Sequence, residues 1–512
     1  MNKATSNMTL TPVERVLQTA LKYPDRPALE LPNSIYSYRE LTEAAASVAQ
    51  SIIELNDPCP FIAVVADKSF SCYSGILGIL MAGKAYMPLN PRFPAARNLY
   101  MMEKAGIRIL IAGENADDEL DTILDSYSSG IYVIFPEGGT SQVTCEVTLP
   151  QNPAYLLFTS GTTGKPKGVA VSIRNLSSYL DFMMKTFDFQ PEDRFTQNFD
   201  LTFDLSVHDL FLAWSSGACL CVPQDNSSFA MARFIREKQP TVWFSVPSVV
   251  LLMDRMRLLK PGAFPSVRLS FFCGEALHSR LANAWKTATP QSRLVNLYGP
   301  TEATIAITCY ELPENSELWK SELGIISIGH IFEGNSFILQ GATSQVTCEV
   351  GEGELCVGGN QVVDGYFQNE EADIDSFYTD PVSLQKWYKT GDLVKVDEDG
   401  DLFFLGRKDA EVKISGYRVN LKEIENVLAE YESVGQAVVI LDKTGDDQGM
   451  ILAFILEKEE EKAEEKELDA FCRQQLPWYM VPGKFIFVKE IPLNLNGKVD
   501  IASLKKIYID GK

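Results

Sequence analysis

The stretch that decides the fold is YLLFTSGTTGKPKGV, residues 155–169, in which an apolar strand runs directly into a loop of serine, threonine, glycine and lysine. Glycine permits close approach of the backbone to a ligand, hydroxyl and amide N–H groups bind phosphate oxygens, and lysine neutralises their charge. The stretch therefore predicts a polyphosphate-binding loop; the alternative is a flexible hairpin without a ligand. It lacks the pattern of P-loop NTPases, because Pro166 follows Lys165.

Around this loop the chain alternates helix-like and strand-like segments. Helical spacing is found in residues 41–55 and 73–82. Buried strands are predicted over residues 60–67, 107–112, 131–135, 219–222, 242–246 and 267–273. Strands that alternate with helices indicate a parallel sheet covered on both faces. We therefore expect an α/β protein with a large N-terminal body of doubly wound sheets.

After Gly351 the pattern of the sequence changes to short strands and turns, which predicts a small β-rich subdomain. A compact α+β pattern then follows, with strands at 411–414, 436–441 and 450–456 and helices at 422–431 and 467–475. We place a domain boundary near Asp409, between an N-terminal domain (1–408) and a small mobile C-terminal domain (409–512). We read the acidic run 457–467 as a solvated helix face rather than a docking patch.

Composition excludes several classes of function. The 512 residues include 68 Asp and Glu but 46 Lys and Arg, a net charge of −22, which argues against a nucleic-acid partner. Ten cysteines without a C-x-x-C pair, and no signal-peptide or membrane-span pattern, predict a reduced cytoplasmic chain. The three histidines lack zinc-site spacing. The octapeptide TSQVTCEV occurs at 140–147 and again at 343–350, and we assign it no function.

The phosphate loop resembles the signature of the adenylate-forming superfamily, which includes acyl-CoA synthetases, luciferases and the adenylation domains of nonribosomal peptide synthetases. Further motifs match in the same order: GILMAGKAYMPLNP from residue 78, NLYGPTEAT from 296, GELCVGG from 353, YKTGDL from 388, GRKDAEVKISGYRVNLKEIE from 406 and PLNLNGKVD from 492. Lys84 stands where glycine is usual and Glu411 where glutamine is usual. We expect neither departure to touch the chemistry.

The resemblance implies a role for each matched position. The ATP phosphates would be held by Thr159, Ser160, Gly161, Thr162, Thr163, Gly164 and Lys165. The adenosine site would comprise Tyr298 stacked on adenine, Asn296 and the Gly274, Glu275 and Ala276 backbone along its edge, Gly299, Thr301, and Asp392 and Arg407 at the ribose. Glu302 would bind Mg²⁺, a hard cation that prefers carboxylates and phosphates. Lys498 would be the catalytic lysine, assisted by Glu302 and Thr159.

The implied reaction is that of an AMP-forming ligase with ATP and Mg²⁺. A substrate carboxylate attacks the α-phosphorus of ATP, which releases pyrophosphate and leaves an acyl-adenylate. Because a carboxylate is already ionised at neutral pH, the reaction needs no general base, in keeping with a chain that has three histidines. The enzyme must supply positioning and neutralisation of charge.

The motif FDLSVHD, which starts at residue 203, resembles the members that activate amino acids. In them the aspartate, here Asp204, pairs with the substrate α-ammonium; the alternative is a plain helix N-cap. The remaining pocket positions are Leu205, His208, Phe244, Phe271, Cys273, Leu297, Ile305 and Ala306. Their bulk predicts a small apolar amino acid. FFCGEAL around Cys273 and FDLSVHDL resemble D-alanine:carrier-protein ligases, and the order of the pocket residues resembles that of stand-alone L-proline-activating enzymes. The resemblance therefore favours L-proline, with D- or L-alanine next. We interpret His208 as pocket wall.

The acceptor is predicted to be a separate molecule, because no condensation domain precedes residue 1 and no carrier motif follows Asp500. The resemblance favours the phosphopantetheine thiol of a stand-alone carrier protein, entering beside residues 416–418, and the enzyme would then form a carbon–sulfur bond. Coenzyme A is the competing acceptor. The alternative of another class is a non-catalytic protein that binds ATP and an amino acid.

Overall fold

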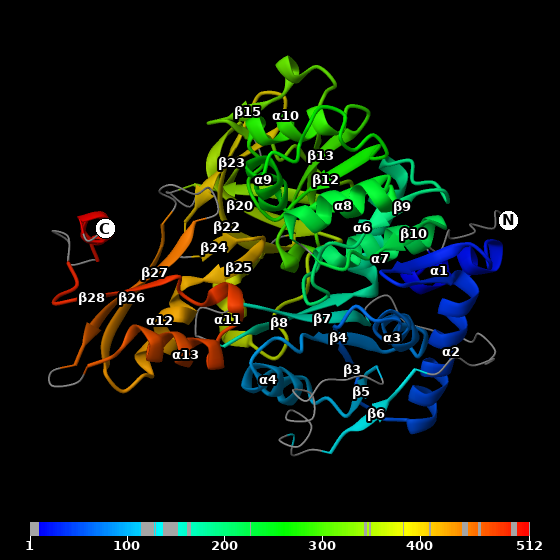
Figure 1. Cartoon of the computed structure of the whole chain (residues 1–512), viewed down its shortest axis with the longest axis horizontal. Coiled ribbons are helices and arrows are strands. Elements are labelled where there is room, and N and C mark those ends of the chain that lie inside the picture. The colour runs from blue at the N-terminus through cyan, green and yellow to red at the C-terminus, as the bar shows by residue number, and fades with distance from the viewer. Residues whose placement is uncertain are drawn as a thin grey trace.

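The computed structural model places a large N-terminal body beside a small C-terminal unit (Figure 1). It describes residues 10–113, 127, 130–136, 152–160, 165–225, 227–341, 346–347, 350–381, 383–408, 411–442, 449–458, 462–492 and 499–510. The predicted α/β class, with a large body and a small C-terminal domain, is confirmed.

One large sheet of the body carries the strand that leads into the phosphate loop. Its strands, in spatial order, are β6 (Tyr132–Ile134), β5 (Ile109–Ile111), β3 (Phe61–Val65), β4 (Ala85–Leu89), β7 (Pro153–Thr159) and β8 (Lys167–Ser172). All neighbours pair in parallel except β7 and β8, which are antiparallel. The predicted parallel sheet is therefore confirmed apart from this edge, where the loop after β7 turns the chain straight back.

The second large sheet carries the other predicted site segments. Its strands, in spatial order, are β17 (His330–Ile331), β14 (Thr308–Glu311), β13 (Arg293–Tyr298), β12 (Leu269–Phe272), β11 (Val242–Ser245), β9 (Arg194–Thr196), β10 (Cys219–Cys221), β1 (Pro27–Leu31) and β2 (Ser34–Ser37). The centre is parallel and both edges are antiparallel. Two N-terminal strands thus complete a sheet formed mainly by residues 194–331.

Helices cover both faces of the two sheets. Packed in the core between the sheets are α1 (Pro12–Lys22), α2 (Tyr38–Leu55), α3 (Phe70–Met81), α6 (Ile173–Thr186) and α7 (Leu205–Ser216). The outer helices are α4 (Ala95–Ala105), α8 (Ser228–Lys238), α9 (Pro247–Arg255) and α10 (Ser279–Ala288). Strand β3 shows why both faces are needed, because Ile62 and Val64 point into the central core whereas Ala63 packs under α4.

The predicted β-rich subdomain follows. Its elements are β18 (Asn335–Gln340), β19 (Val346–Thr347), β20 (Gly351–Gly359), α11 (Glu370–Ser376), β21 (Phe377–Thr379), β22 (Lys386–Val396) and β23 (Leu402–Arg407). The sheet therefore begins before the predicted start at Gly351. The short elements η1 (Thr301–Ala303), η2 (Ser316–Leu318), β15 (Ser321–Glu322) and β16 (Ile325–Ile326) precede it. Leu355 on β20 and Val394 on β22 belong to the central core, so the subdomain is continuous with the body.

The C-terminal unit has cores of its own. Its elements are β24 (Glu411–Ile414), β25 (Tyr417–Asn420), α12 (Leu421–Ala429), β26 (Val434–Asp442), β27 (Met450–Glu457), α13 (Glu465–Gln475), η3 (Trp478–Met480), β28 (Lys484–Val488) and α14 (Ile501–Asp510). Strands β24 and β25 form a hairpin, and β26, β27 and β28 form a sheet. The reading of 457–467 as one helix face is wrong in its extent, because α13 begins at Glu465.

Candidate active site

The predicted site residues gather where the two large sheets face the C-terminal hairpin. Thr159 and Ser160 end β7, Asp204 precedes α7, and Cys273 and Gly274 follow β12. Carboxyl ends of parallel strands meet at one edge of a sheet, which is where ligands of open α/β sheets bind. A cavity of about 50 Å³ lies at this edge. Its lining residues are Phe93, Leu157, Phe158, Thr159, Ser160, Thr202, Phe203, Asp204, Thr301, Tyr417, Arg418 and Tyr479.

Asp204 is a buried acidic residue immediately before the first residue of α7. It occupies the N-cap position, yet its side chain makes no capping hydrogen bond. Burial raises the pKa of Asp204 to about 7, although a hydrogen bond from Thr301 and the positive charge of Lys413 work against that rise. Asp204 forms no ion pair with any other side chain in the part of the chain that the structure describes. A cationic ligand would therefore find an unpaired carboxyl group here.

Replacement of Asp204 by asparagine is expected to stabilise the fold at alkaline pH. The pKa of about 7 in the folded state lies above the usual 3.8, so stability is full below the lower value and is lost as the pH rises through the higher one. Asparagine carries no such charge. The gain of Asp204→Asn in free energy of unfolding should grow from about pH 4 and level off near pH 8, reaching on the order of a few kcal/mol, and a rise in melting temperature relative to wild type over the same pH range checks it. A pH-independent difference would contradict the assignment.

The remaining predicted pocket residues lie behind Asp204 and are almost fully buried. They are Leu205, His208, Phe244, Phe271, Cys273, Leu297, Ile305 and Ala306. The His208 ring centroid lies 4.3 Å from that of Phe244 and 5.0 Å from that of Phe271. None of the eight lines the cavity that Asp204 lines. The structure therefore buries these eight predicted pocket residues without bringing them into the lining of the cavity.

His208 has one ring nitrogen engaged. Its Nδ1 lies 2.6 Å from the Tyr179 hydroxyl, whereas Nε2 is buried without a partner. Burial lowers the pKa of His208 to about 3, so the imidazole is neutral at physiological pH. A neutral ring wedged between Phe244 and Phe271 suits a pocket wall. Tyr179, which fixes its orientation, carries no motif in the sequence that would have pointed to it.

Glu302 is fully buried at the start of η1, and its carboxylate is occupied. Arg418 Nη1 donates to both oxygens, at 3.1 Å and 3.0 Å, and the Tyr366 hydroxyl donates at 2.7 Å. Burial raises the pKa of Glu302, but the Arg418 guanidinium and Tyr366 outweigh it, and the net pKa is lowered. An oxygen set already bound by a guanidinium does not fit the hard divalent cation expected here. In this arrangement Glu302 holds an arginine.

The predicted adenosine site is assembled around Asp392. One carboxylate oxygen accepts a hydrogen bond from the Tyr298 hydroxyl and the other from Arg407 Nη1, each at 2.6 Å. Arg407 also reaches Glu411 at 2.6 Å, and Glu411 in turn accepts from Arg418 Nε at 2.5 Å. The expectation that Glu411 stays clear of the chemistry is therefore wrong, because this buried carboxylate joins two site arginines. Lys84 instead donates to the Asp57 and Cys59 carbonyls.

The neighbouring predicted positions are backbone or amide groups. Asn296 Nδ2 donates to the Ser327 carbonyl at 2.9 Å, while its Oδ1 is buried without a partner. Gly299 lies so close to Ala306 that an added Cβ would fall 2.5 Å from its Cα, which leaves room for glycine alone. Thr301 hydrogen-bonds Asp204. Glu275 accepts from the N–H groups of Ser248 and Gly416, and Ala276 follows it.

The β24–β25 hairpin of the C-terminal unit is docked into this site. The Gly416 N–H donates to Glu275 Oε1 at 2.7 Å, and Ser160 Oγ donates to the Arg418 carbonyl at 2.8 Å. Gly416 has φ +84°, and a Cβ there would meet Val246 Cγ1 at 2.4 Å, so only glycine permits this approach. Lys413 Nζ lies 5.9 Å from the Tyr298 ring centroid. The hairpin thus contributes both charge and backbone to the pocket.

Several predicted residues fall outside the described part of the chain. These are Gly161, Thr162, Thr163 and Gly164 of the phosphate loop, Asp409 at the proposed boundary, the catalytic candidate Lys498, and the first copy of the octapeptide with most of the second. Lys165, at the loop's far end, is exposed, with its Nζ 5.7 Å from the Tyr100 ring centroid.

Comparison with known proteins decides the family. The AMP-binding enzyme model matches residues 16–367, and that of the AMP-binding enzyme C-terminal domain matches residues 423–498. The chain belongs to the AMP-binding enzyme family. Its resemblance to the adenylate-forming superfamily is thereby confirmed.

Two curated relatives and one solved structure extend the comparison. The chain is 31% identical to tyrocidine synthase 1 of Brevibacillus parabrevis, covering 95% of this chain and 44% of that protein. It is 32% identical to tyrocidine synthase 3 of the same organism, covering 97% of this chain and 8% of that protein. The chain therefore spans less than half the length of these relatives. The Vibrio cholerae adenylation domain AlmE, solved with glycyl-adenosine-5'-phosphate, matches with a TM-score of 0.88, 28% identity and full coverage of both chains.

Further contacts hold the C-terminal unit of this AMP-binding enzyme against its body. Arg97 Nη1 on α4 donates to Glu423 Oε1 on α12 at 2.8 Å, and both side chains are buried. Tyr417 stacks on Tyr479 at 3.9 Å between ring centroids and on Phe203 at 5.6 Å. Removal of one partner of a buried ion pair is costly, so Arg97 and Glu423 fix the docked position together with the hairpin.

Sequence reasoning missed some site residues. Lys167 is buried, its Nζ lies 4.9 Å from the Tyr366 ring centroid, and burial together with Arg418 lowers its pKa. Its position in the KPKG segment, directly after the phosphate loop, could have identified Lys167 as a site residue from the sequence. Lys413 and the side chain of Arg418 lie in the hairpin motif, whereas Tyr366, which binds Glu302, stands in no motif.

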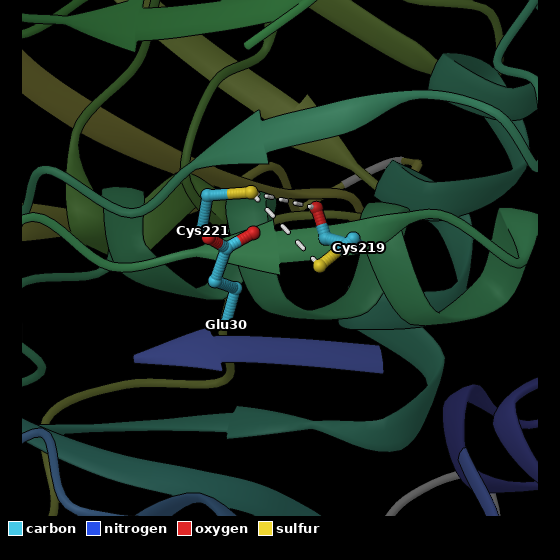
Figure 2. Close-up of side chains that lie close together, drawn as sticks. All are labelled: Glu30, Cys219 and Cys221. Carbon is cyan, nitrogen blue, oxygen red and sulfur yellow. Dashed lines mark hydrogen bonds between the residues drawn. The ribbon is translucent and has the colours of Figure 1, made fainter. Parts of the chain in front are cut away.

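A second cluster of potential metal ligands lies away from the site. The ligand atoms of Glu30, Cys219 and Cys221 lie within 4.8 Å of one another, and Figure 2 shows them converging from neighbouring strands. However, Glu30 already binds Arg194 and Lys238, the latter at 2.7 Å. A carboxylate neutralised by two cations is a poor ligand for a third, so we assign no metal to this cluster. The two cysteines fill a buried strand, as predicted.

Among the helices that the structure describes, none has both the length and the apolar character needed to cross a membrane.

Proposed function

We propose that this AMP-binding enzyme activates a small amino acid with ATP. The substrate carboxylate attacks the α-phosphorus, a new phosphorus–oxygen bond forms, and the bond to the β-phosphate breaks with release of pyrophosphate. The observation that carries the proposal is Asp204, a buried carboxyl group that lines the cavity and has no ion-pair partner within contact distance among the described residues. An α-ammonium group would supply the missing cation.

The pocket supports a small side chain. Phe244, Phe271 and His208 pack on one another where a long side chain would extend. We keep L-proline as the favoured substrate and alanine as the next. The glycyl-adenylate bound to the AlmE structure adds glycine to the candidates.

The second half of the proposed reaction transfers the acyl group to a thiol. A thiolate attacks the acyl carbon, a carbon–sulfur bond forms, and AMP leaves. We propose a carrier-protein phosphopantetheine as the thiol, with the docked segment at Gly416 and Arg418 beside its path. Residues 1–408 and 409–512 would be the two domains that rearrange between the half-reactions.

An amino-acid-dependent pyrophosphate-exchange panel tests the proposal. Exchange with glycine, alanine or proline well above exchange with phenylalanine or tryptophan is expected. Loading of a carrier protein, compared with that of coenzyme A, then identifies the acceptor. A protein that binds ATP and an amino acid but exchanges no pyrophosphate would be a binding protein instead.

Pocket volume gives a further prediction. Phe244→Ala or Phe271→Ala should shift the preference toward larger apolar amino acids, because each methylene in such a pocket discriminates by about 1–3 kcal/mol. The ratio of kcat/KM for leucine and alanine measures the shift. Tyr36→Ala, which removes a ring stacked on Phe70 outside the pocket, is the control. A wild-type enzyme that already prefers phenylalanine would contradict the small pocket.

A further inference from the structure

The arginine on Glu302 is held in place from several sides. Arg418 Nε donates to Glu411 at 2.5 Å, and its Nη atoms lie 3.2 Å and 3.3 Å from the Tyr388 hydroxyl. Its backbone carbonyl accepts from Ser160 Oγ at 2.8 Å. The position of the guanidinium at Glu302 is therefore fixed by several further hydrogen bonds. An exposed side chain that met Glu302 by chance would lack them.

Charge decides what else Glu302 can hold in this arrangement. Both carboxylate oxygens point at Arg418 Nη1, and the Tyr366 hydroxyl occupies a further acceptor position. A divalent cation on the same buried carboxylate would face the guanidinium at short range in a low dielectric, where like charges repel strongly. The guanidinium and the cation therefore cannot share Glu302.

We propose that Arg418 and a divalent cation compete for Glu302, so that the docked β24–β25 hairpin and a metal on Glu302 exclude each other. The proposal rests on the proposed function, because only that function brings a metal to Glu302. Arg418 is then a positioning residue that couples the place of the C-terminal unit to the metal state of the site. By reciprocity, a metal on Glu302 must weaken docking of the hairpin by the same factor by which docking weakens metal binding.

The test measures metal affinity and hairpin position without turnover. Protein saturated with α,β-methylene-ATP is titrated with Mn²⁺, and binding is followed by electron paramagnetic resonance. Hydrogen exchange of the peptide over residues 411–420 reports the hairpin. In the wild type, exchange should rise as Mn²⁺ binds. Since coupling between sites is typically worth about 5- to 150-fold in affinity, Arg418→Met should bind Mn²⁺ at least about fivefold more tightly.

Arg97→Met is the matched control. It removes another buried ion pair between the same two units, with Glu423, away from Glu302. It should loosen the hairpin yet leave the exchange response to Mn²⁺ in place. Arg418→Lys, which retains the charge without the fork of donors, should bind Mn²⁺ with intermediate affinity, and thermal melting confirms that each variant is folded. Glu302→Gln, combined with Arg418→Met, should abolish the gain in Mn²⁺ affinity that Arg418→Met alone produces.

Two outcomes would overturn the proposal. Equal Mn²⁺ affinity in wild type and Arg418→Met would show that the two cations do not compete. A hydrogen-exchange response to Mn²⁺ that persists in Arg418→Met as it does in Arg97→Met would show that Arg418 does not couple the hairpin to the metal. Failure of the pyrophosphate-exchange panel is a separate result. It would contradict the proposed amino-acid activation, but Mn²⁺ binding could still be measured and interpreted.

Discussion

Asp204→Ala is expected to abolish amino-acid-dependent pyrophosphate exchange. Asp204 is buried, and no described side chain forms an ion pair with it. If the substrate ammonium is its partner, truncation leaves that cation buried and unpaired, which costs about 3–5 kcal/mol. At about 1.4 kcal/mol for each tenfold change, kcat/KM should fall between roughly 10²-fold and several thousandfold.

The substrate supplies the control for this experiment. Propionate is alanine without its ammonium group, so it gains nothing from Asp204 and should be activated about equally poorly by both proteins. The comparison of alanine with propionate in wild type and variant forms a cycle that isolates the pairing energy. An equal loss with both acids would show that Asp204 acts on the fold or on ATP, and the ammonium assignment would be wrong.

The sequence was most informative where local pattern and chemistry coincide. Strands such as Phe61–Val65 and Leu269–Phe272 were predictable because runs of apolar residues must be buried on both faces of a parallel sheet. The C-terminal elements from β24 to α13 were placed to within a few residues, because the amphipathic helices there alternate with short apolar strands. The antiparallel edges and the return of β1 and β2 to a distant sheet could not be predicted, since no local pattern specifies long-range pairing.

Site residues were predictable as members of a set, but their contacts were not. The motifs named Glu302 and Asp392, yet neither spacing nor composition shows that a C-terminal arginine binds the first or that Tyr298 and Arg407 share the second. Those contacts depend on where one unit docks on the other. Glu411 shows the same limit. It is a one-residue departure from the motif, and only the structure shows that it is buried and accepts hydrogen bonds from both Arg407 and Arg418.

The fold of the C-terminal unit gives a physical basis for the largest remaining prediction. Its sheet of β26, β27 and β28 has a separate core on each face. Tyr417 of the docked hairpin packs with the core that contains Val439, whereas Val499, next to Lys498 in sequence, packs with the core that contains Val438. Adjacent strand residues point to opposite faces. The hairpin residue Tyr417 and Val499 therefore pack on opposite sides of one sheet, which supports the proposal that different faces of this unit serve the two half-reactions.

Lys498→Ala is accordingly expected to lower adenylate formation by on the order of 10²-fold or more, as removal of a preorganised charge contact typically does. The same variant should still transfer acyl groups from supplied aminoacyl-adenylate, because the hairpin face is untouched. Asp409→Pro, which fixes φ at the proposed hinge, should show the reverse if it traps the adenylating arrangement, with exchange active and carrier loading slow. If the two faces of the C-terminal unit enter the pocket in turn, as proposed, we expect the two half-reactions to separate in these variants. Equal loss of both half-reactions in both folded variants would exclude a rotating C-terminal domain.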